Sequence, residues 1–125
     1  MGDSGKARKR VLVVDDEARL LTFVEIRLRL AGYDVTMASS GQDGLDLVRR
    51  VKPDIVVLDV LMPGKDGFEV LRELRTFSRV PVIVFSARQG AAELAMSLGA
   101  SAFLSKPFDP DDLVDRIRGL LGPGC

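Results

Sequence analysis

A chain of 125 residues has the length of one ordinary domain, and it is long enough to bury a continuous hydrophobic core without disulfides. Its 18 Lys and Arg residues balance its 18 Asp and Glu residues, so the net charge gives no reason to expect direct binding to nucleic acid or to an anionic membrane. The absence of histidine excludes the commonest general base and transition-metal ligand, and the single cysteine, Cys125, excludes an internal disulfide.

The ends of the chain differ in composition from its middle. Residues 1–9 are small, polar and basic, and we predict a disordered tail there. One domain is predicted over residues 10–121, and residues 122–125 are predicted to form a short C-terminal tail. No apolar stretch approaches the roughly 20 residues that span a bilayer, and the first ten residues lack the apolar segment of a signal peptide. We therefore expect a cytoplasmic protein.

From Arg10 onward, short apolar runs alternate with longer segments of helical period. A first strand is predicted over residues 10–15, followed by a helix over 17–31. Residues 33–38 form a weaker strand of the kind found at a sheet edge, and Ser40 is a suitable cap for a second helix. The third strand is predicted over 54–59.

Residues 60–67 are dense in turn-forming residues and predict a shaped loop. The remaining predicted elements are a helix from 68 to about 77, a strand over 82–85, a helix over 91–98, a strand over 100–104 and a final helix capped by Asp109 and Pro110. Five strands alternating with five helices predict an α/β fold with a parallel sheet covered on both faces. We predict the flavodoxin-like, doubly wound strand order 2-1-3-4-5.

Polar side chains stand at the ends of four of these strands. Asp15 and Asp16 follow the first strand, Asp59 ends the third, Ser86 follows the fourth and Lys106 follows the fifth. Neighbouring parallel strands lie roughly 4.8 Å apart, so these groups are expected to share one edge of the sheet. Singly, each has an ordinary explanation, since Asp is common in turns, Ser86 could cap the next helix and Lys106 could begin a loop. The coincidence of four strand ends favours a site.

Clustered carboxylates predict a bound cation. Unit charges about 4 Å apart repel by roughly 4 kcal/mol at an effective dielectric of 20. An all-oxygen set of ligands selects a hard ion, and few protein ligands suit Mg²⁺. A metal beside a carboxylate, a hydroxyl and an ammonium is suited to phosphoryl transfer, in which Asp59 would be the acceptor.

Four motifs in order resemble the receiver domain of two-component response regulators. They are Val11-Leu12-Val13-Val14-Asp15-Asp16-Glu17, Leu58 through Gly67 (LDVLMPGKDG), Ser86-Ala87 and Lys106-Pro107-Phe108. The resemblance covers about residues 10 to 121. It implies that Asp59 accepts a phosphoryl group from a phosphohistidine on a sensor histidine kinase or a histidine phosphotransfer protein.

The same resemblance implies roles for the other residues. Asp16, Asp59 and the backbone carbonyl of Leu61 would bind Mg²⁺, with Asp15 acting through water. Ser86 and Lys106 would each bind a phosphoryl oxygen, and the Lys106-Pro107 bond is expected to be cis.

Phosphorylation would draw Ser86 inward, and Phe103 would act as the switch residue. The altered surface, around the fourth helix, fifth strand and fifth helix, would signal to a downstream effector. A homodimer is allowed, although Ser101 and Ala102 replace the paired acids that often mediate it. The stretch between Ser86 and Lys106 is about two residues shorter than usual, so the loop at 88–91 is expected to differ.

We expect slow self-dephosphorylation, because neither Leu61 nor Arg88 can orient or deprotonate the hydrolytic water. The protein would therefore modify itself without turning over a separate substrate, and would not be an enzyme in that sense. The alternatives are an aspartyl-phosphate phosphohydrolase, a docking-only receiver that is never phosphorylated, and a nucleotide or flavin binder. The first lacks a second Asp at position 61, and the last lacks a Gly-rich phosphate loop after the first strand.

Overall fold

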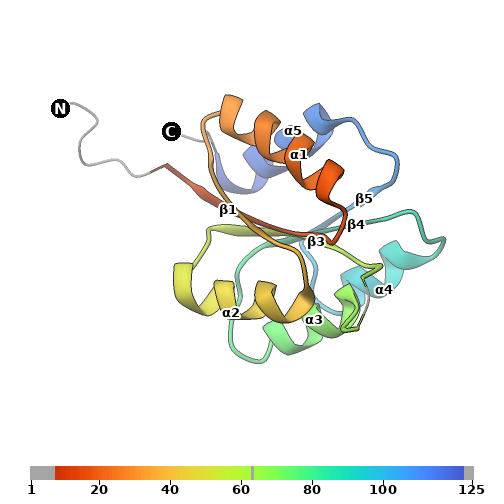
Figure 1. Cartoon of the computed structure of the whole chain (residues 1–125). Coiled ribbons are helices and arrows are strands. Elements are labelled where there is room, and N and C mark those ends of the chain that lie inside the picture. The colour runs from red at the N-terminus through yellow and green to blue at the C-terminus, as the bar shows by residue number, and fades with distance from the viewer. Residues whose placement is uncertain (1–7, 63, 123–125) are drawn as a thin grey trace.

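The structure, a computed structural model, describes residues 8–62 and 64–122 (Figure 1). Residues 8 and 9 have no regular secondary structure. The rest of the predicted N-terminal tail, and residues 123–125, lie outside the described residues. The first strand begins at Arg10 and the last helix ends at Leu121.

Strands and helices alternate along the whole described chain. The elements are β1 (Arg10–Val14), α1 (Ala18–Leu30), β2 (Asp34–Ala38), α2 (Gly41–Val51), β3 (Ile55–Asp59), α3 (Gly67–Leu74), β4 (Val82–Ser86), α4 (Ala91–Ser97), β5 (Ala102–Ser105) and α5 (Pro110–Leu121). Every predicted element is present, with small shifts at the ends.

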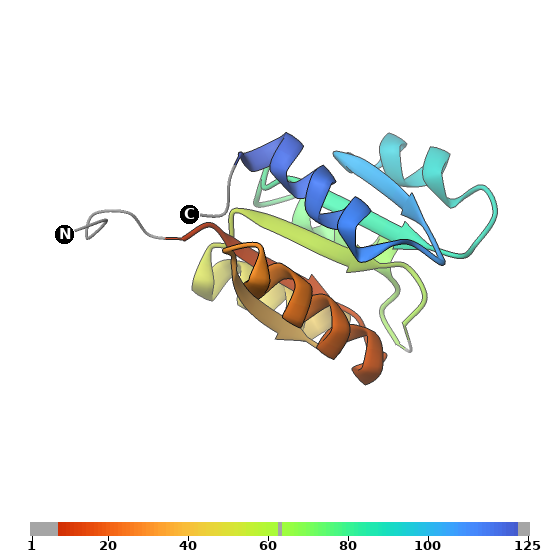
Figure 2. The same ribbon diagram turned by 90° about the horizontal axis from the view of Figure 1, so that it is seen from above.

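The strands form one parallel sheet of order β2-β1-β3-β4-β5, which confirms the predicted flavodoxin-like fold and places the weak strand β2 at an edge. Helices α1 and α5 cover one face, and α2, α3 and α4 cover the other (Figure 1). Figure 2, which views the molecule from above, shows α1 and α5 lying over the same face. Among the described residues, no helix combines the length and apolar character needed to cross a bilayer.

Side-chain alternation divides the core into two clusters, one on each face of the sheet. In β1, Leu12 and Val14 belong to the cluster beneath α2, α3 and α4, whereas Val11 and Val13 belong to the cluster beneath α1 and α5. Every residue of the central strand β3 is buried, because helices cover both of its faces. The end of β3 is consequently a rigid place for a functional side chain.

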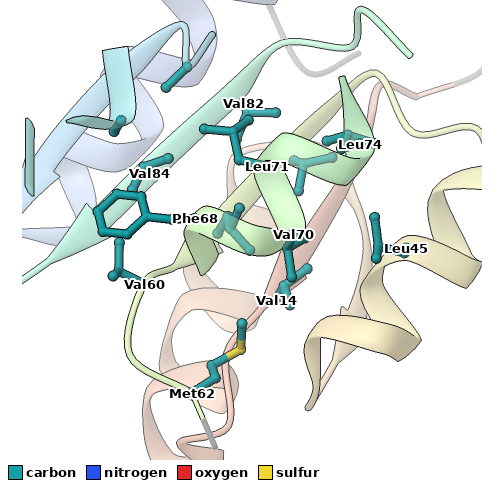
Figure 3. Packing of buried hydrophobic residues seen from close by; sticks show 14 of the residues in the cluster. Val14, Leu45, Val60, Met62, Phe68, Val70, Leu71, Leu74, Val82 and Val84 are labelled. Carbon is teal, nitrogen blue, oxygen red and sulfur yellow. The ribbon is translucent and has the colours of Figure 1, made fainter. Parts of the chain in front are cut away.

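The loop that follows β3 is anchored in the core. Val60 and Met62 are both buried. Figure 3 shows them among the side chains of the cluster that includes Phe68 of α3. This anchoring fixes the chain immediately after Asp59.

Three helices begin with side-chain caps. Ser40 accepts a hydrogen bond from a backbone N–H in the first turn of α2, as predicted. Asp66 and Glu69 form a reciprocal capping box at the start of α3, and Asp109 caps α5 ahead of Pro110. These caps satisfy backbone donors at helix starts that face the carboxyl edge of the sheet.

Helix α3 ends at Leu74, earlier than the predicted end near Phe77. The next residues form a tight turn that leads back toward β4. The guanidinium of Arg75 holds this turn by donating hydrogen bonds to the carbonyls of Ser78 and Gly99. Long-range bonds of this kind leave no mark in the helical period of a sequence.

Candidate functional site

The predicted site residues come together at the carboxyl edge of the sheet. Asp15 directly follows β1, Asp59 ends β3, Ser86 ends β4 and Lys106 directly follows β5. The register places Asp59 opposite Phe85, one residue before Ser86, on the neighbouring strand. The strand order predicted from the sequence is therefore what brings these groups together.

Three carboxylates share this edge. One oxygen from each of Asp15, Asp16 and Asp59 lies within 4.8 Å of the others. Asp15 and Asp59 are buried, and Asp16 is exposed. The predicted crowding of acidic groups is confirmed.

The buried oxygens of this cluster are incompletely paired. Asp15 Oδ1 accepts a hydrogen bond of 3.0 Å from the backbone N–H of Glu17. Asp15 Oδ2 and Asp59 Oδ1 accept no hydrogen bond. The ammonium Nζ of Lys106 lies 3.3 Å from Asp59 Oδ1 and 4.0 Å from Asp15 Oδ2, so one cation faces both atoms.

The pKa of Asp15 is raised from 3.8 to about 7, chiefly by burial and in part by the nearby carboxylate of Asp59. The hydrogen bond from Glu17 and the charge of Lys106 oppose this rise but do not cancel it. Without an additional cation, Asp15 is therefore held near the midpoint of its titration at neutral pH.

Ser86 is buried at the end of β4, and its Oγ accepts a hydrogen bond of 2.9 Å from the backbone N–H of Arg88. It does not cap α4, whose N-cap is Gly90 and which has no side-chain cap. The ordinary explanation for a serine at this position, that it caps the next helix, is therefore wrong. Because Oγ acts as acceptor in this turn, its own proton is available to a ligand.

Lys106 is held by aromatic and backbone contacts. Its backbone N–H donates to the carbonyl of Ser86 at 2.9 Å, and the Lys106-Pro107 peptide bond is cis, as predicted. Its Nζ lies 4.9 Å from the ring centre of Phe85, which packs edge-on against Phe108 at 5.5 Å between ring centres. The Phe85–Phe108 pair could not be predicted from the sequence, since two aromatic residues 23 positions apart carry no signal of contact.

Gly67, which the sequence predicts only as part of a turn, also shapes the site. A Cβ at this position would lie 2.2 Å from the backbone carbonyl oxygen of Asp59. The Gly67 N–H donates to the carbonyl of Val60 at 2.8 Å. Only glycine lets α3 begin this close to the end of β3.

Leu61, Arg88 and Phe103 flank the site and differ in exposure and contacts. The Leu61 side chain is 58% exposed, and the Arg88 guanidinium carbon lies 5.6 Å from the ring centre of Phe68. Phe103 of β5 is half-buried and packs against the cluster beneath α2, α3 and α4.

A family model described as a response regulator receiver domain matches residues 11–118. The chain belongs to this family. Two relatives carry the name "Probable transcriptional regulator ycf27": that of Guillardia theta is 41% identical over 118 residues, covering 93% of this chain and 46% of the relative. That of Porphyridium aerugineum is 40% identical over 116 residues, covering 91% and 48%. The receiver domain thus spans about half the length of these relatives.

Solved structures agree with this assignment. The signal receiver domain of a response regulator from Bermanella marisrubri is 35% identical, covers 92% of this chain and 99% of that chain, and has a TM-score of 0.85.

Proposed function

We propose that this receiver domain accepts a phosphoryl group on Asp59 from a phosphohistidine of a sensor histidine kinase or a histidine phosphotransfer protein. The observation that carries the proposal is the environment of Asp59. Its carboxylate is buried beside two others, one of its oxygens accepts no hydrogen bond, and a lysine ammonium lies 3.3 Å from that oxygen. A purely structural role would leave this carboxylate costly and unexplained.

The acidic cluster fits Mg²⁺. All of its donors are oxygen atoms, and two buried oxygens lack hydrogen-bond partners. Asp16, Asp59 and the backbone carbonyl of Leu61 would hold the ion, and Asp15 would act through a water molecule. When bound, Mg²⁺ would supply positive charge that offsets the repulsion between the carboxylates and the incoming phosphoryl oxygens.

The chemistry is a single displacement at phosphorus. An oxygen of Asp59 forms the new O–P bond, the P–N bond to the partner's imidazole breaks, and the imidazole nitrogen keeps the bonding electrons. Lys106 offsets the charge of one phosphoryl oxygen, since its ammonium already faces Asp59. Ser86 donates its free hydroxyl proton to another.

Phosphorylation adds roughly two negative charges where Ser86 and Lys106 meet. Movement of Ser86 toward the phosphoryl group would alter the turn that it forms with Arg88, which leads into α4. Phe103, half-buried on the adjacent strand, would repack beneath α4. The changed surface of α4, β5 and α5 would then act on an effector, which we place in transcription because the two relatives are named as regulators of it.

The acyl phosphate is expected to be long-lived. Hydrolysis needs a group that orients the attacking water, and the residues beside the site are the aliphatic Leu61 and the cationic Arg88. The same reasoning disfavours an aspartyl-phosphate phosphohydrolase, which would need a carboxylate in place of Leu61. A docking-only receiver would have no use for a buried Asp59 oxygen that accepts no hydrogen bond.

Mass spectrometry after incubation with acetyl phosphate and Mg²⁺ tests the proposal. The wild type should gain one phosphoryl group, and Asp59→Asn should gain none. Asp34→Asn is a matched control, because Asp34 is exposed at the start of β2 and should remain competent. Modification of Asp59→Asn at the wild-type level would refute the assignment, and steady turnover of p-nitrophenyl phosphate would favour the phosphohydrolase.

A further inference from the structure

Exposed cations gather at one edge of the sheet, although the chain is neutral overall. The carboxyl edge holds the acidic cluster and the acidic caps of α3 and α5. The opposite edge, where the strands begin, carries a group of exposed cations that we call the basic edge. It consists of Arg10, Arg49, Arg50, Lys52 and Arg79.

The fold itself gathers these residues. Arg10 is the first residue of β1, and Arg49 and Arg50 lie in the last turn of α2, which runs antiparallel to the strands. Lys52 is the C-cap of α2, and Arg79 stands just ahead of β4. All five therefore lie at the edge where the strands start, and Asp59 lies at the opposite edge, where β3 ends.

The basic edge is poorly neutralised by its neighbours. Within residues 8–62 and 64–122, the ion pairs involve other cations: Arg27, Arg29, Lys65 and Lys106. Two acids lie at the same edge: Asp54 accepts a hydrogen bond of 2.7 Å from the backbone N–H of Arg10, and the exposed Asp34 stands opposite Arg10 in the strand register. These two carboxylates offset only part of the charge of the five cations. The pKa of Arg75 is lowered chiefly by burial and then by the charge of Arg79, which shows that cations are crowded here.

A cavity of about 380 Å³ opens within the basic edge. Arg49, Lys52 and Ser78 supply its polar lining, and Phe77 supplies part of its apolar wall. The guanidinium carbon of Arg49 lies 3.9 Å from the ring centre of Phe77, so stacking holds this cation in place before any ligand arrives. A preorganised cation loses less conformational freedom when it binds an anion.

We propose that the basic edge binds the phosphate backbone of duplex DNA without sequence preference. Duplex DNA presents one negative charge per about 1.7 Å of its axis, which suits several cations spread along an edge. The acidic carboxyl edge would repel DNA, so contact through the basic edge leaves Asp59 open to its kinase. This inference rests on the proposed function, because an effector that acts in transcription brings the receiver close to DNA and raises its effective concentration there.

Binding is tested with the full 125-residue chain and a fluorescein-labelled 20-base-pair duplex of arbitrary sequence, measured by fluorescence anisotropy between 25 and 200 mM NaCl. The test variant is Arg50→Glu/Arg79→Glu, since both side chains are exposed and neither makes a side-chain hydrogen bond or ion pair among the described residues. The matched control is Arg19→Glu/Arg116→Glu, which makes the same change in net charge on exposed arginines away from the basic edge.

The wild type should bind with a dissociation constant near the weak, non-specific range of about 10⁻⁴ to 10⁻⁶ M and lose affinity steeply with salt. The Arg50→Glu/Arg79→Glu variant should bind at least tenfold more weakly, and the control should change by less than threefold. Absence of binding at 25 mM NaCl would overturn the proposal, as would an equal loss in both variants. Tighter binding of the wild type to vesicles of phosphatidylcholine and phosphatidylglycerol than to DNA would assign the edge to a membrane surface instead.

Failure of this inference is distinguishable from failure of the proposed function. Acetyl phosphate should phosphorylate the Arg50→Glu/Arg79→Glu variant to the wild-type extent, because neither residue lies at the carboxyl edge. DNA binding is measured on unphosphorylated protein, so it does not depend on Asp59. Loss of phosphorylation in the variant together with loss of DNA binding would indicate misfolding, which circular dichroism of the same sample would show. In that case the DNA measurement is repeated with Arg50→Gln/Arg79→Gln.

Discussion

Substitution of Asp15 by Asn should stabilise the metal-free protein at alkaline pH. Asp15 is buried, and its Oδ2 accepts no hydrogen bond. The Asn side-chain oxygen can still accept the hydrogen bond that Asp15 Oδ1 receives from Glu17. The change therefore removes a buried negative charge and keeps the local backbone contact.

The magnitude follows from the pKa of Asp15, which is raised from 3.8 to about 7 in the folded chain. The folded state binds this proton more tightly than the unfolded state. The free energy of unfolding therefore falls as pH rises between those two pKa values. At about 1.4 kcal/mol per pH unit, the full penalty above pH 7 reaches about 4 kcal/mol. Near pH 4 the carboxyl is protonated in the folded state and the penalty is nearly absent.

Urea unfolding followed by circular dichroism measures the effect, since the chain has no tryptophan to serve as a fluorescent probe. In EDTA at pH 8, we expect Asp15→Asn to exceed the wild type in unfolding free energy by about 2 to 4 kcal/mol. The gap should close toward pH 4, and Mg²⁺ at pH 8 should stabilise the wild type more than the variant. Asp34→Asn, a substitution on an exposed carboxylate, should show neither trend.

Two outcomes would refute this reasoning. Equal stability of Asp15→Asn and the wild type at pH 8 in EDTA would mean that the buried charge is compensated by contacts beyond Lys106. A gap of the same size at pH 4 and pH 8 would show that the effect is not electrostatic.

Three further predictions concern residues around the site. Gly67→Ala should lower the unfolding free energy by about 1 to 3 kcal/mol, because its Cβ would meet the Asp59 carbonyl oxygen at 2.2 Å; thermal unfolding measures this, and an unchanged melting temperature would contradict it. Asp66→Ala should cost about 1 kcal/mol by removing the capping box with Glu69, whereas Asp66→Ser should recover most of that loss in urea unfolding. Leu61→Asn should shorten the lifetime of the acyl phosphate several-fold, because an amide can orient the hydrolytic water; decay after EDTA quenching measures it, and a lifetime as long as that of the wild type would exclude position 61 from the water path.

Much of the fold could be predicted because four of the five strands carry two signals in the sequence, an apolar run and a polar residue at its end. The all-apolar run before Asp59 indicated a central strand, and polar residues in 33–38 indicated an edge. The positions of Asp15, Asp59, Ser86 and Lys106 followed from strand order alone. Their shared edge is a matter of backbone geometry, which local sequence determines well.

Other features depend on contacts between residues distant in sequence, and these could not be predicted. The turn that follows α3 is held by Arg75, which reaches the carbonyl of Gly99. The turn made by Ser86 and Arg88 depends on a choice of side-chain rotamer. The gathering of cations at the basic edge is invisible in a net charge of zero, because it requires knowing that Arg50 and Arg79 lie on the same side of the molecule.

The hydrogen bond between the Lys106 N–H and the Ser86 carbonyl couples the backbones at the ends of β4 and β5 directly. A displacement of the Ser86 backbone would therefore shift the Lys106 backbone through this bond, without rearrangement of the hydrophobic core. Ser86 and Lys106, which would bind the same phosphoryl group, are thus connected through their main chains as well as through that ligand. The rate of hydrogen–deuterium exchange at the Lys106 amide would accordingly report the strength of this hydrogen bond before and after activation.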